Sequence, residues 1–432
     1  MEVRKITESK KVSKSERKSS QKGELLKNIY SSNLRDLLNI CYQCARCSGV
    51  CQISKVQYFR PSRIIQKILE GFEEEILKSG ILWDCLMCNQ CLAHCPENIN
   101  FADIVRNAKY IMRNEYQHSS GDYIAHKGVY TSIAELMSKL EVKPKRDMSW
   151  IPKECEVSDS GEILYHIGCI PFYNFEFEEL NNIPPTTLRL LYKVEEQPIV
   201  VLENEYCCGH DLYWGEGKME EFISLAQKNI HNFEKAGISK IITTCAEGYR
   251  TFKIDYPKIF EDFNAKFEVQ HIIEYIYENW KAGNLEFETD DVPKEQISFT
   301  FHDPCRLSRF LPKSNTIMMK AREMFLYLKK MGYHFNEMEH NKENSLCCGV
   351  SSWMNCNERS KALRYKRLKE AKDAGDIMVT TCPKCILHFN CLQNDYEEIA
   401  SIKIQDFTEF LIKLIKIDKN QNTNGKLKAE VK

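Results

Sequence analysis

The sequence lacks an excess of one charge, a long apolar run and a secretory signal, three features typical of nucleic-acid-binding, membrane and secreted proteins. Its charges balance, with 60 Lys and Arg against 61 Asp and Glu, which does not favour nucleic acid or an anionic membrane as a partner. No run of about 20 apolar residues is present to form a transmembrane helix. The basic, polar N-terminus has no apolar segment of the kind found in secretory signals. We therefore expect a cytoplasmic protein that can reach a membrane only through a partner subunit.

Cysteine, in contrast, is abundant. The chain has 20 cysteines in 432 residues, and without a secretory signal they indicate metal ligands in a reducing compartment rather than disulfides. A chain of this length is expected to form two to four domains, each with its own core.

Residues 24–125 contain two copies of one cysteine motif, Cys-x2-Cys-x2-Cys-x3-Cys. The copies are Cys41, Cys44, Cys47 and Cys51, and then Cys85, Cys88, Cys91 and Cys95. This is the spacing of bacterial ferredoxins with two cubane 4Fe–4S clusters, where the fourth cysteine of each motif binds the other cluster. The spacing therefore predicts a cluster 1 set and a cluster 2 set: Cys41, Cys44, Cys47 and Cys95, and Cys51, Cys85, Cys88 and Cys91. A pair of zinc knuckles is the less favoured alternative.

Between the two copies, apolar residues recur with helical spacing at Ile64, Ile65, Ile68 and Leu69. This pattern predicts a helical ferredoxin domain rather than the small β-rich form.

The remainder of the chain is an internal repeat with a period of 135 to 140 residues. Each copy has a strand-like segment ending at a cysteine, a Cys-Cys-Gly triplet, and a helix closing on Ala-Gly before a second strand and cysteine. The matching positions are Cys169 and Cys305, Cys207-Cys208 and Cys347-Cys348, Cys245 and Cys382, and His271 and Asp406. Apolar strands that alternate with helices predict parallel sheets, with the cysteines at the strand ends where ligands bind in α/β folds.

We therefore expect an α+β multidomain protein with a helical ferredoxin domain followed by two tandem α/β modules. The expected ranges are a disordered tail (1–23), the ferredoxin domain (24–125), a connector (126–160), module 1 (161–285), module 2 (286–417) and a second tail (418–432).

The two modules differ in their cysteines. Module 2 has five, Cys305, Cys347, Cys348, Cys382 and Cys385, which is more than the four ligands of a structural zinc and indicates an iron–sulfur cluster. Module 1 has four, Cys169, Cys207, Cys208 and Cys245, because Gly248 occupies the fifth position. These four could bind zinc or an incomplete cluster, with Glu247 or His210 as a possible additional ligand or, as we favour, a neighbour of the ligands.

Several other residues near these motifs have a structural and a functional interpretation. Cys155 is expected to be a free surface thiol, and Cys356 and Cys391 are expected to be structural. His302 is expected to pack or hydrogen-bond at a strand end, with proton donation as the alternative. Arg306 and Lys384 either favour the reduced state of a bound cluster or are simply exposed.

Two ferredoxin motifs followed by two Cys-Cys-Gly modules resemble the catalytic subunit of heterodisulfide reductases. The resemblance covers about residues 24–415 and rests on 17 of the cysteines. It implies that Cys305, Cys347, Cys348, Cys382 and Cys385 hold a noncubane 4Fe–4S cluster that attacks a disulfide. Gly248 departs from the family members that carry two complete motifs, which weakens the case for a second such cluster.

The resemblance implies a disulfide reductase that receives electrons from a flavoprotein or membrane cytochrome partner, through two cubane clusters. The alternative is a non-catalytic electron-transfer subunit of a dehydrogenase complex, of the glycerol-3-phosphate, lactate or glycolate type, that delivers electrons to quinone or a cytochrome.

Overall fold

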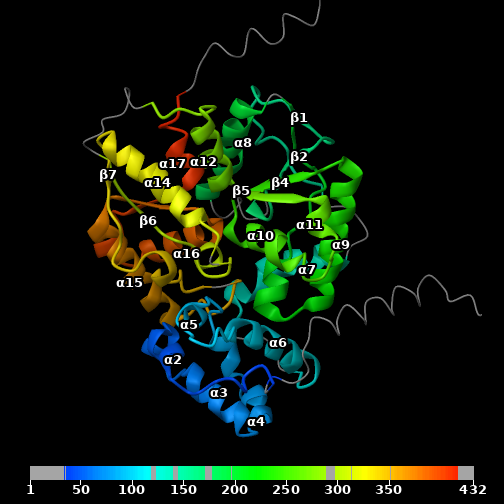
Figure 1. Cartoon of the computed structure of the whole chain (residues 1–432), viewed down its shortest axis with the longest axis vertical. Helices are drawn as coiled ribbons and strands as arrows, with labels where there is room; N and C mark the ends of the chain where they lie inside the picture. The colour runs from blue at the N-terminus through cyan, green and yellow to red at the C-terminus, as the bar shows by residue number, and fades with distance from the viewer. Residues whose placement is uncertain are drawn as a thin grey trace, which may run out of the picture.

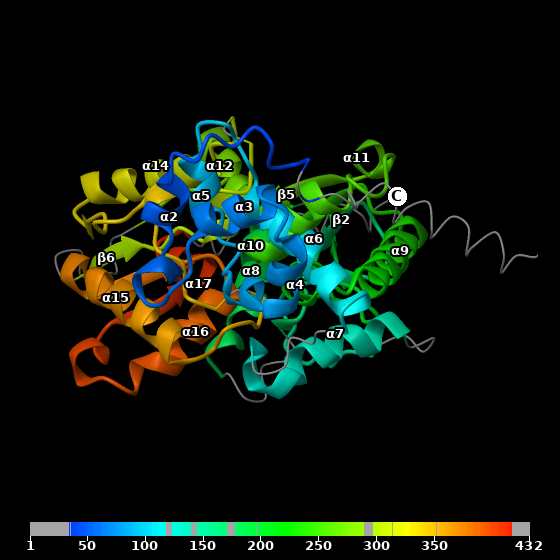
Figure 2. The same ribbon diagram turned by 90° about the horizontal axis from the view of Figure 1, so that it is seen from below.

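The computed structural model describes residues 34, 36–117, 123–139, 145–170, 178–195, 197–288, 297–312, 314–350 and 352–416. The predicted tails at 1–23 and 418–432 lie outside these residues. In Figure 1, the helices of the ferredoxin domain lie at one end of the molecule, and two α/β units lie side by side at the other. Figure 2 shows the same helices from below, in front of both units.

The ferredoxin domain is helical, as the apolar spacing predicts. Its longest helix between the cysteine motifs begins at Pro61, where the missing N–H of proline costs no hydrogen bond, and it buries Ile64, Ile65 and Ile68. The elements are α2 (Arg46–Val50), η1 (Ile53–Lys55), α3 (Pro61–Leu69), α4 (Glu73–Ser79), η2 (Ile81–Asp84), α5 (Gln90–Ala93) and α6 (Phe101–Asn114).

Module 1 contains a parallel five-stranded sheet with strand order β1-β3-β2-β4-β5. Leu164 and Ile241 are paired and fully buried in adjacent strands, because helices cover both faces of the sheet. The elements are β1 (Val157–Ser158), β2 (Ile163–Tyr165), η6 (Glu178–Leu180), α8 (Ile183–Val194), β3 (Ile199–Val200), η7 (Leu212–Glu216), α9 (Met219–Ala236), β4 (Lys240–Thr243), α10 (Ala246–Arg250), η8 (Thr251–Asp255), α11 (Phe263–Lys266), β5 (Glu268–His271) and α12 (Ile272–Ala282).

Module 2 contains a parallel four-stranded sheet with strand order β7-β6-β8-β9. This order repeats β3-β2-β4-β5 of module 1, which confirms the predicted fold class of two α/β modules with parallel sheets. The elements are β6 (Ser298–Phe301), α13 (Cys305–Ser308), α14 (Ile317–Lys330), β7 (His334–Phe335), η10 (Lys342–Asn344), α15 (Glu358–Ala374), β8 (Ile377–Thr380), α16 (Pro383–Gln393), η11 (Glu397–Ile399), β9 (Lys403–Asp406) and α17 (Phe407–Leu411).

The repeat extends to the helix caps after the last strand of each sheet. His271 caps α12 and Asp406 caps α17, each with a Glu three residues later that completes a capping box. α17 packs against α8 of module 1, where Thr187 donates a hydrogen bond to Thr408 over 3.2 Å. The C-terminal helix therefore docks between the two modules.

The range 126–160, predicted as a connector, contains η4 (Ala125–Gly128) in part, α7 (Val129–Lys139) and β1. Just before it, Ile124 forms an isolated antiparallel bridge with Met354 of module 2, while α7 packs on α9 of module 1. This segment thus contacts both modules. No helix in the described residues is long and apolar enough to cross a membrane.

Candidate functional site

The cysteines of the cluster 1 set lie together near the surface of the ferredoxin domain. Burial and the nearby thiols of Cys41, Cys44 and Cys95 raise the pKa of Cys47 to about 11. Cys44 is exposed, whereas the other three are partly buried. The structure therefore brings together the four cysteines that the spacing assigns to cluster 1.

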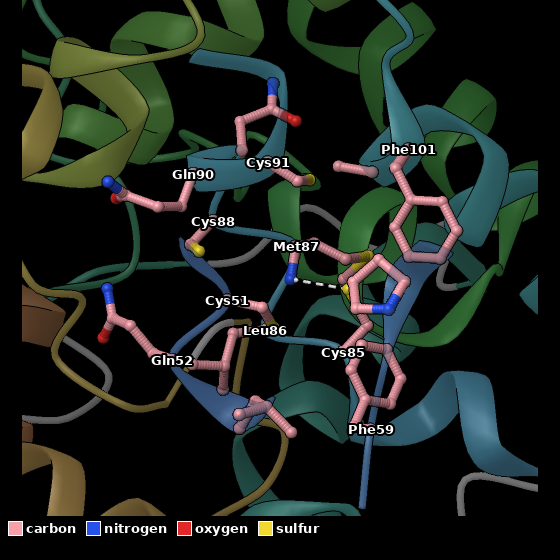
Figure 3. A pocket seen from close by; sticks show the side chains of 14 residues that line it. Cys51, Gln52, Phe59, Cys85, Leu86, Met87, Cys88, Gln90, Cys91 and Phe101 are labelled. Atoms are coloured by element: carbon pink, nitrogen blue, oxygen red, sulfur yellow. Dashed lines mark hydrogen bonds between the residues drawn. The ribbon is translucent and has the colours of Figure 1, made fainter. Parts of the chain in front are cut away.

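The four cysteines of the cluster 2 set line one small cavity (Figure 3). Burial and the thiols of Cys85, Cys88 and Cys51 raise the pKa of Cys91 well above its usual value. The backbone N–H of Met87 donates to the Cys85 sulfur over 3.3 Å. Backbone donors of this kind stabilise sulfur ligands and tune cluster potentials, so the donor set fits a cubane cluster.

The five cysteines of module 2 come from three loops at the carboxyl end of its sheet. Cys305 begins α13 directly after β6, Cys382 caps α16 after β8, and Cys385 lies in the first turn of α16. Cys347 and Cys348 follow η10 in the loop that leads to α15. Parallel strands present their carboxyl ends on one edge, which is why residues so far apart in sequence meet there.

The thiols of module 2 form a continuous chain of contacts. Cys305 contacts Cys347, Cys347 contacts Cys348, Cys348 contacts Cys385, and Cys385 contacts Cys382. Hydrogen bonds from Cys347 and Cys385 lower the pKa of Cys348 to about 6 despite its burial. Metal is bound by the thiolate form, so the lowered pKa suits Cys348 to be a ligand.

The glycine of this Cys-Cys-Gly triplet allows the loop to approach α15 closely. Gly349 has φ of 80°, a conformation that L side chains rarely adopt, and a Cβ there would lie 2.9 Å from the Ser360 carbonyl oxygen. Cys347 and Cys348 are consequently held against a fixed helix.

In module 1, Cys169 contacts Cys207, and Cys207 contacts Cys208. Cys245 instead contacts Cys382 of module 2. The cysteines of the two modules are therefore adjacent across the module interface, and Cys169 lies close enough to Cys245 to raise its pKa as well.

Lys384 of the module 2 Cys-Pro-Lys-Cys segment reaches into module 1. It is 4% exposed, and its ammonium pairs with Asp211 and, at 2.8 Å, with Glu247. Burial raises the pKa of Glu247 to about 7, although Lys384 opposes that shift. The alternative that Lys384 is merely exposed is wrong, and the same holds for Arg306, which is 1% exposed.

The spacing of the thiols favours clusters over single zinc ions. Four sulfurs around one zinc, each about 2.3 Å from it, lie roughly 3.8 Å apart. In the described part of the chain, the only group with three potential ligand atoms within 4.8 Å of one another is Glu339, His340 and Glu370. No three thiols there meet that distance, as is expected when the sulfurs bind different irons of one cluster.

Two arginines hold the cluster 2 loop against module 2. Arg306 donates to the Met87 carbonyl over 3.1 Å, and Arg309 donates to the Cys88 carbonyl over 2.6 Å and to the Ser345 carbonyl over 2.8 Å. The Cys88 thiol lies close enough to Cys347 to contribute to the raised pKa of that thiol. The cluster 2 set and the module 2 set are thus neighbours.

His302 packs at the end of β6, as its favoured reading predicts. Its Nδ1 accepts a hydrogen bond from Arg367 over 3.0 Å, so the neutral ring carries its proton on Nε2. Burial, Arg367 and Arg309 hold the pKa of His302 well below its usual range. His302 is therefore suited to donate a hydrogen bond, and a protonated, acidic form is disfavoured.

The cysteines outside the motifs have three different environments. Cys155 is buried and packs in the core, so the prediction of a surface thiol is wrong; a reduced thiol behaves as a small apolar group. Cys356 is half-buried and accepts a hydrogen bond from Arg364 over 3.7 Å. Cys391 is exposed.

Sequence reasoning did not identify Arg309, Gln52 or Lys109 as parts of the site. Each of these three residues contacts a segment that is far from it in the sequence. No motif spacing relates such a residue to its distant partner. Gln52 offered one signal, because it stands after Cys51 where ferredoxin motifs of this type have proline, as the second copy does at Pro96.

Comparison with known families agrees with this arrangement. Residues 37–99 match the 4Fe-4S dicluster domain family. Residues 163–253 and 299–390 each match the cysteine-rich domain family. The two families account for the regions that contain all seventeen motif cysteines.

The relatives of this chain include oxidoreductases and their subunits. The chain is 26% identical over 340 residues to a subunit of the dihydromethanophenazine:CoB–CoM heterodisulfide reductase of Methanosarcina barkeri, covering 77% of this chain and 76% of that protein. It is 23% identical over 388 residues to a subunit of the fumarate reductase (CoM/CoB) of Methanothermobacter marburgensis, covering 86% and 71%. It is 24% identical over 361 residues to the EtfAB:quinone oxidoreductase of Syntrophomonas wolfei, covering 78% of this chain and 47% of that protein.

No solved structure matches the chain. The matched domains, their order and the gathered cysteines together identify the chain as an iron–sulfur oxidoreductase built from a 4Fe-4S dicluster domain and two cysteine-rich domains, similar to a subunit of heterodisulfide reductase.

Proposed function

We propose that the chain reduces a disulfide, or oxidises the corresponding dithiol, at the five cysteines of module 2. The observation that carries the proposal is the placement of these thiols, which form one buried chain of contacts directly beside the cluster 2 set. When bound, cubane clusters supply single electrons, and a cluster at the module 2 set would supply the site where the two electrons for a disulfide are combined.

The chain's own residues have distinct roles in this proposal. Cys305, Cys347, Cys348, Cys382 and Cys385 would hold the module 2 cluster, and Arg306 places buried positive charge beside it. Positive charge favours the more negative, reduced state. His302 offers a buried N–H, without a protein partner among the described residues, at the end of β6.

Electrons would enter at cluster 1, because Cys44 is the exposed thiol among the eight ferredoxin cysteines. The names of two relatives describe subunits, and we propose that this chain likewise receives electrons from a partner, a flavoprotein or a cytochrome. Module 1 would serve as an accessory, with its four cysteines holding an incomplete cluster.

Replacing Cys348 with Ser tests the proposal. We expect C348S to lose disulfide reduction by reduced viologen, and about one cluster's worth of iron, while both cubane EPR signals remain. C391S, at an exposed cysteine that is not part of a motif, is the matched control and should behave as wild type. Persistent disulfide turnover in C348S would show that the chemistry lies elsewhere.

A second candidate is a non-catalytic conduit that delivers electrons to quinone or a cytochrome. It is favoured by the glycine at position 248 and by the similarity to a quinone oxidoreductase. Wild-type protein that oxidises reduced viologen with a quinone analogue, but with no member of a disulfide panel, would support the conduit and exclude the reductase.

A further inference from the structure

Gln52 connects the ferredoxin domain to the complete cysteine motif. It directly follows Cys51, and its side-chain oxygen Oε1 accepts a hydrogen bond from the backbone N–H of Cys347 over 3.1 Å. The residue is 3% exposed, so water does not compete for this bond. Figure 3 shows its side chain at the rim of the cavity formed by the cluster 2 set.

The side-chain nitrogen of Gln52, Nε2, is buried and has no hydrogen-bond partner among the described residues. Because the Cys347 N–H requires an acceptor, the oxygen must face it, and Nε2 must be the remaining atom. The two atoms share one planar group, so Nε2 lies beside the Cys347-Cys348 loop. A buried donor without an acceptor loses its hydrogen bonds to water and gains none in return, which makes an accidental placement unfavourable.

The surrounding contacts keep Gln52 in this position. Arg309 ties the Cys88 carbonyl of the ferredoxin domain to the Ser345 carbonyl, two residues before Cys347. These contacts hold the loops that carry Cys51, Cys88 and Cys347 in place relative to one another. Gln52 connects the Cys51 loop to the Cys347 loop.

The backbone at position 52 does not itself require glutamine. Gln52 has φ of −65°, the value that proline imposes, and Cys51 is extended, as a residue before proline must be. Proline occupies the matching place at Pro96. The glutamine side chain is thus the feature that distinguishes the two copies.

We propose that Gln52 is a positioning residue of the module 2 site. Its Oε1 holds the Cys347 backbone, and its Nε2–H donates to the iron–sulfur group that Cys347 and Cys348 hold. Such a donor stabilises added negative charge, so it makes one-electron reduction of that group easier, with no bond to Gln52 made or broken. The inference rests on the proposed function only for the presence of this group, and it does not depend on the substrate.

The test measures the midpoint potential of the EPR or optical signal that C348S removes, in anaerobic redox titrations of the full holoprotein. Q52P keeps the backbone conformation and removes the amide. Q52E keeps an acceptor for Cys347 but replaces the N–H donor with an oxygen. Q66E, on α3 where Gln66 contacts Arg63 and Glu70 instead, is the matched control.

We expect Q52P to lower the reduced-to-oxidised ratio of this signal about tenfold at a fixed potential, which for one electron is 59 mV. Q52E should shift it at least as far, and Q66E should leave it unchanged. An unshifted signal in both Gln52 variants would overturn the proposal, as would equal shifts of the cubane signals, which would indicate a general structural role. If wild type reduces no disulfide but Q52P still shifts the signal, the proposed reaction fails and this inference stands.

Discussion

At the scale of single residues, Lys109 is a cation with almost no access to water. It lies on α6, is 0% exposed, and donates to the Gly215 carbonyl of module 1 over 3.2 Å. Its ammonium also lies 4.9 Å from the centre of the Trp83 ring. Burial lowers its pKa to about 8, against the opposing effect of the nearby Cys85 thiol. Lys109 therefore places a titratable positive charge beside the cluster 2 set.

Replacing Lys109 with Met should make cluster 2 harder to reduce. Loss of one buried charge is expected to lower its reduced-to-oxidised ratio about tenfold, or 59 mV for one electron, in an EPR-monitored titration. Because Lys109 is charged below its pKa and neutral above it, the wild-type potential should fall as pH rises from about 7 to about 9. K109M should lack this pH dependence, and K67M, at a half-exposed lysine, should retain it. A wild-type potential independent of pH would contradict this role.

At the scale of elements, η7 (Leu212–Glu216) is a single π-helical turn that follows the module 1 Cys-Cys-Gly triplet and ends at Gly217. Its glycines permit close packing against two other parts of the chain. A Cβ on Gly217 would lie 2.8 Å from the Tyr110 backbone nitrogen, and one on Gly215 would lie 2.7 Å from the Ser352 carbonyl oxygen. This turn is where the ferredoxin domain and both modules meet.

Replacing Gly217 with Ala should destabilise the protein by roughly 2–5 kcal/mol. The estimate combines about 1–2 kcal/mol for a left-handed alanine with about 1–3 kcal/mol for overpacking. Gly283 also has positive φ, but a Cβ added there would meet nothing within 4 Å, so G283A should show the backbone cost alone. Anaerobic denaturant unfolding measures both, and equal losses would argue against close packing at Gly217.

At the scale of the whole molecule, buried polar contacts hold the ferredoxin domain on module 2. Arg309 is 7% exposed and donates to three carbonyls, those of Cys88, Glu343 and Ser345. Arg359 crosses the same interface to Asp84 at 3.6 Å, but its side chain is half-exposed. Arg309 should therefore contribute more to the stability of the interface than Arg359, because an exposed ion pair contributes little.

Replacing Arg309 with Met should loosen this interface and cost roughly 2–4 kcal/mol, because one buried and two partly buried carbonyls lose their donor. Hydrogen exchange should rise at both the Cys85–Cys91 and the Glu343–Cys348 segments. R359M should cost under about 1 kcal/mol and leave exchange there unchanged. Similar effects of the two substitutions would mean that the buried contacts do not hold the domains together.

The amino-acid sequence by itself determined the parts of the protein that depend on local order. Cysteine spacing defined both ferredoxin motifs, and the repeat of strand, Cys-Cys-Gly triplet, helix and strand defined two parallel α/β modules with cysteines at the strand ends. These features are readable because each is set by residues close together in the chain, and because both are present twice.

Only the tertiary structure decided how the sites are related. Gln52 bonds to Cys347 across 295 residues, Cys245 meets Cys382 of the other module, and Lys384 is buried against Asp211. No periodicity in the sequence relates the members of such pairs. Whether a charged side chain acts on a site or is solvated depends on its burial, which the sequence does not give. The contacts between the ferredoxin domain and module 2 therefore depend on how the domains pack, which local cysteine motifs do not specify.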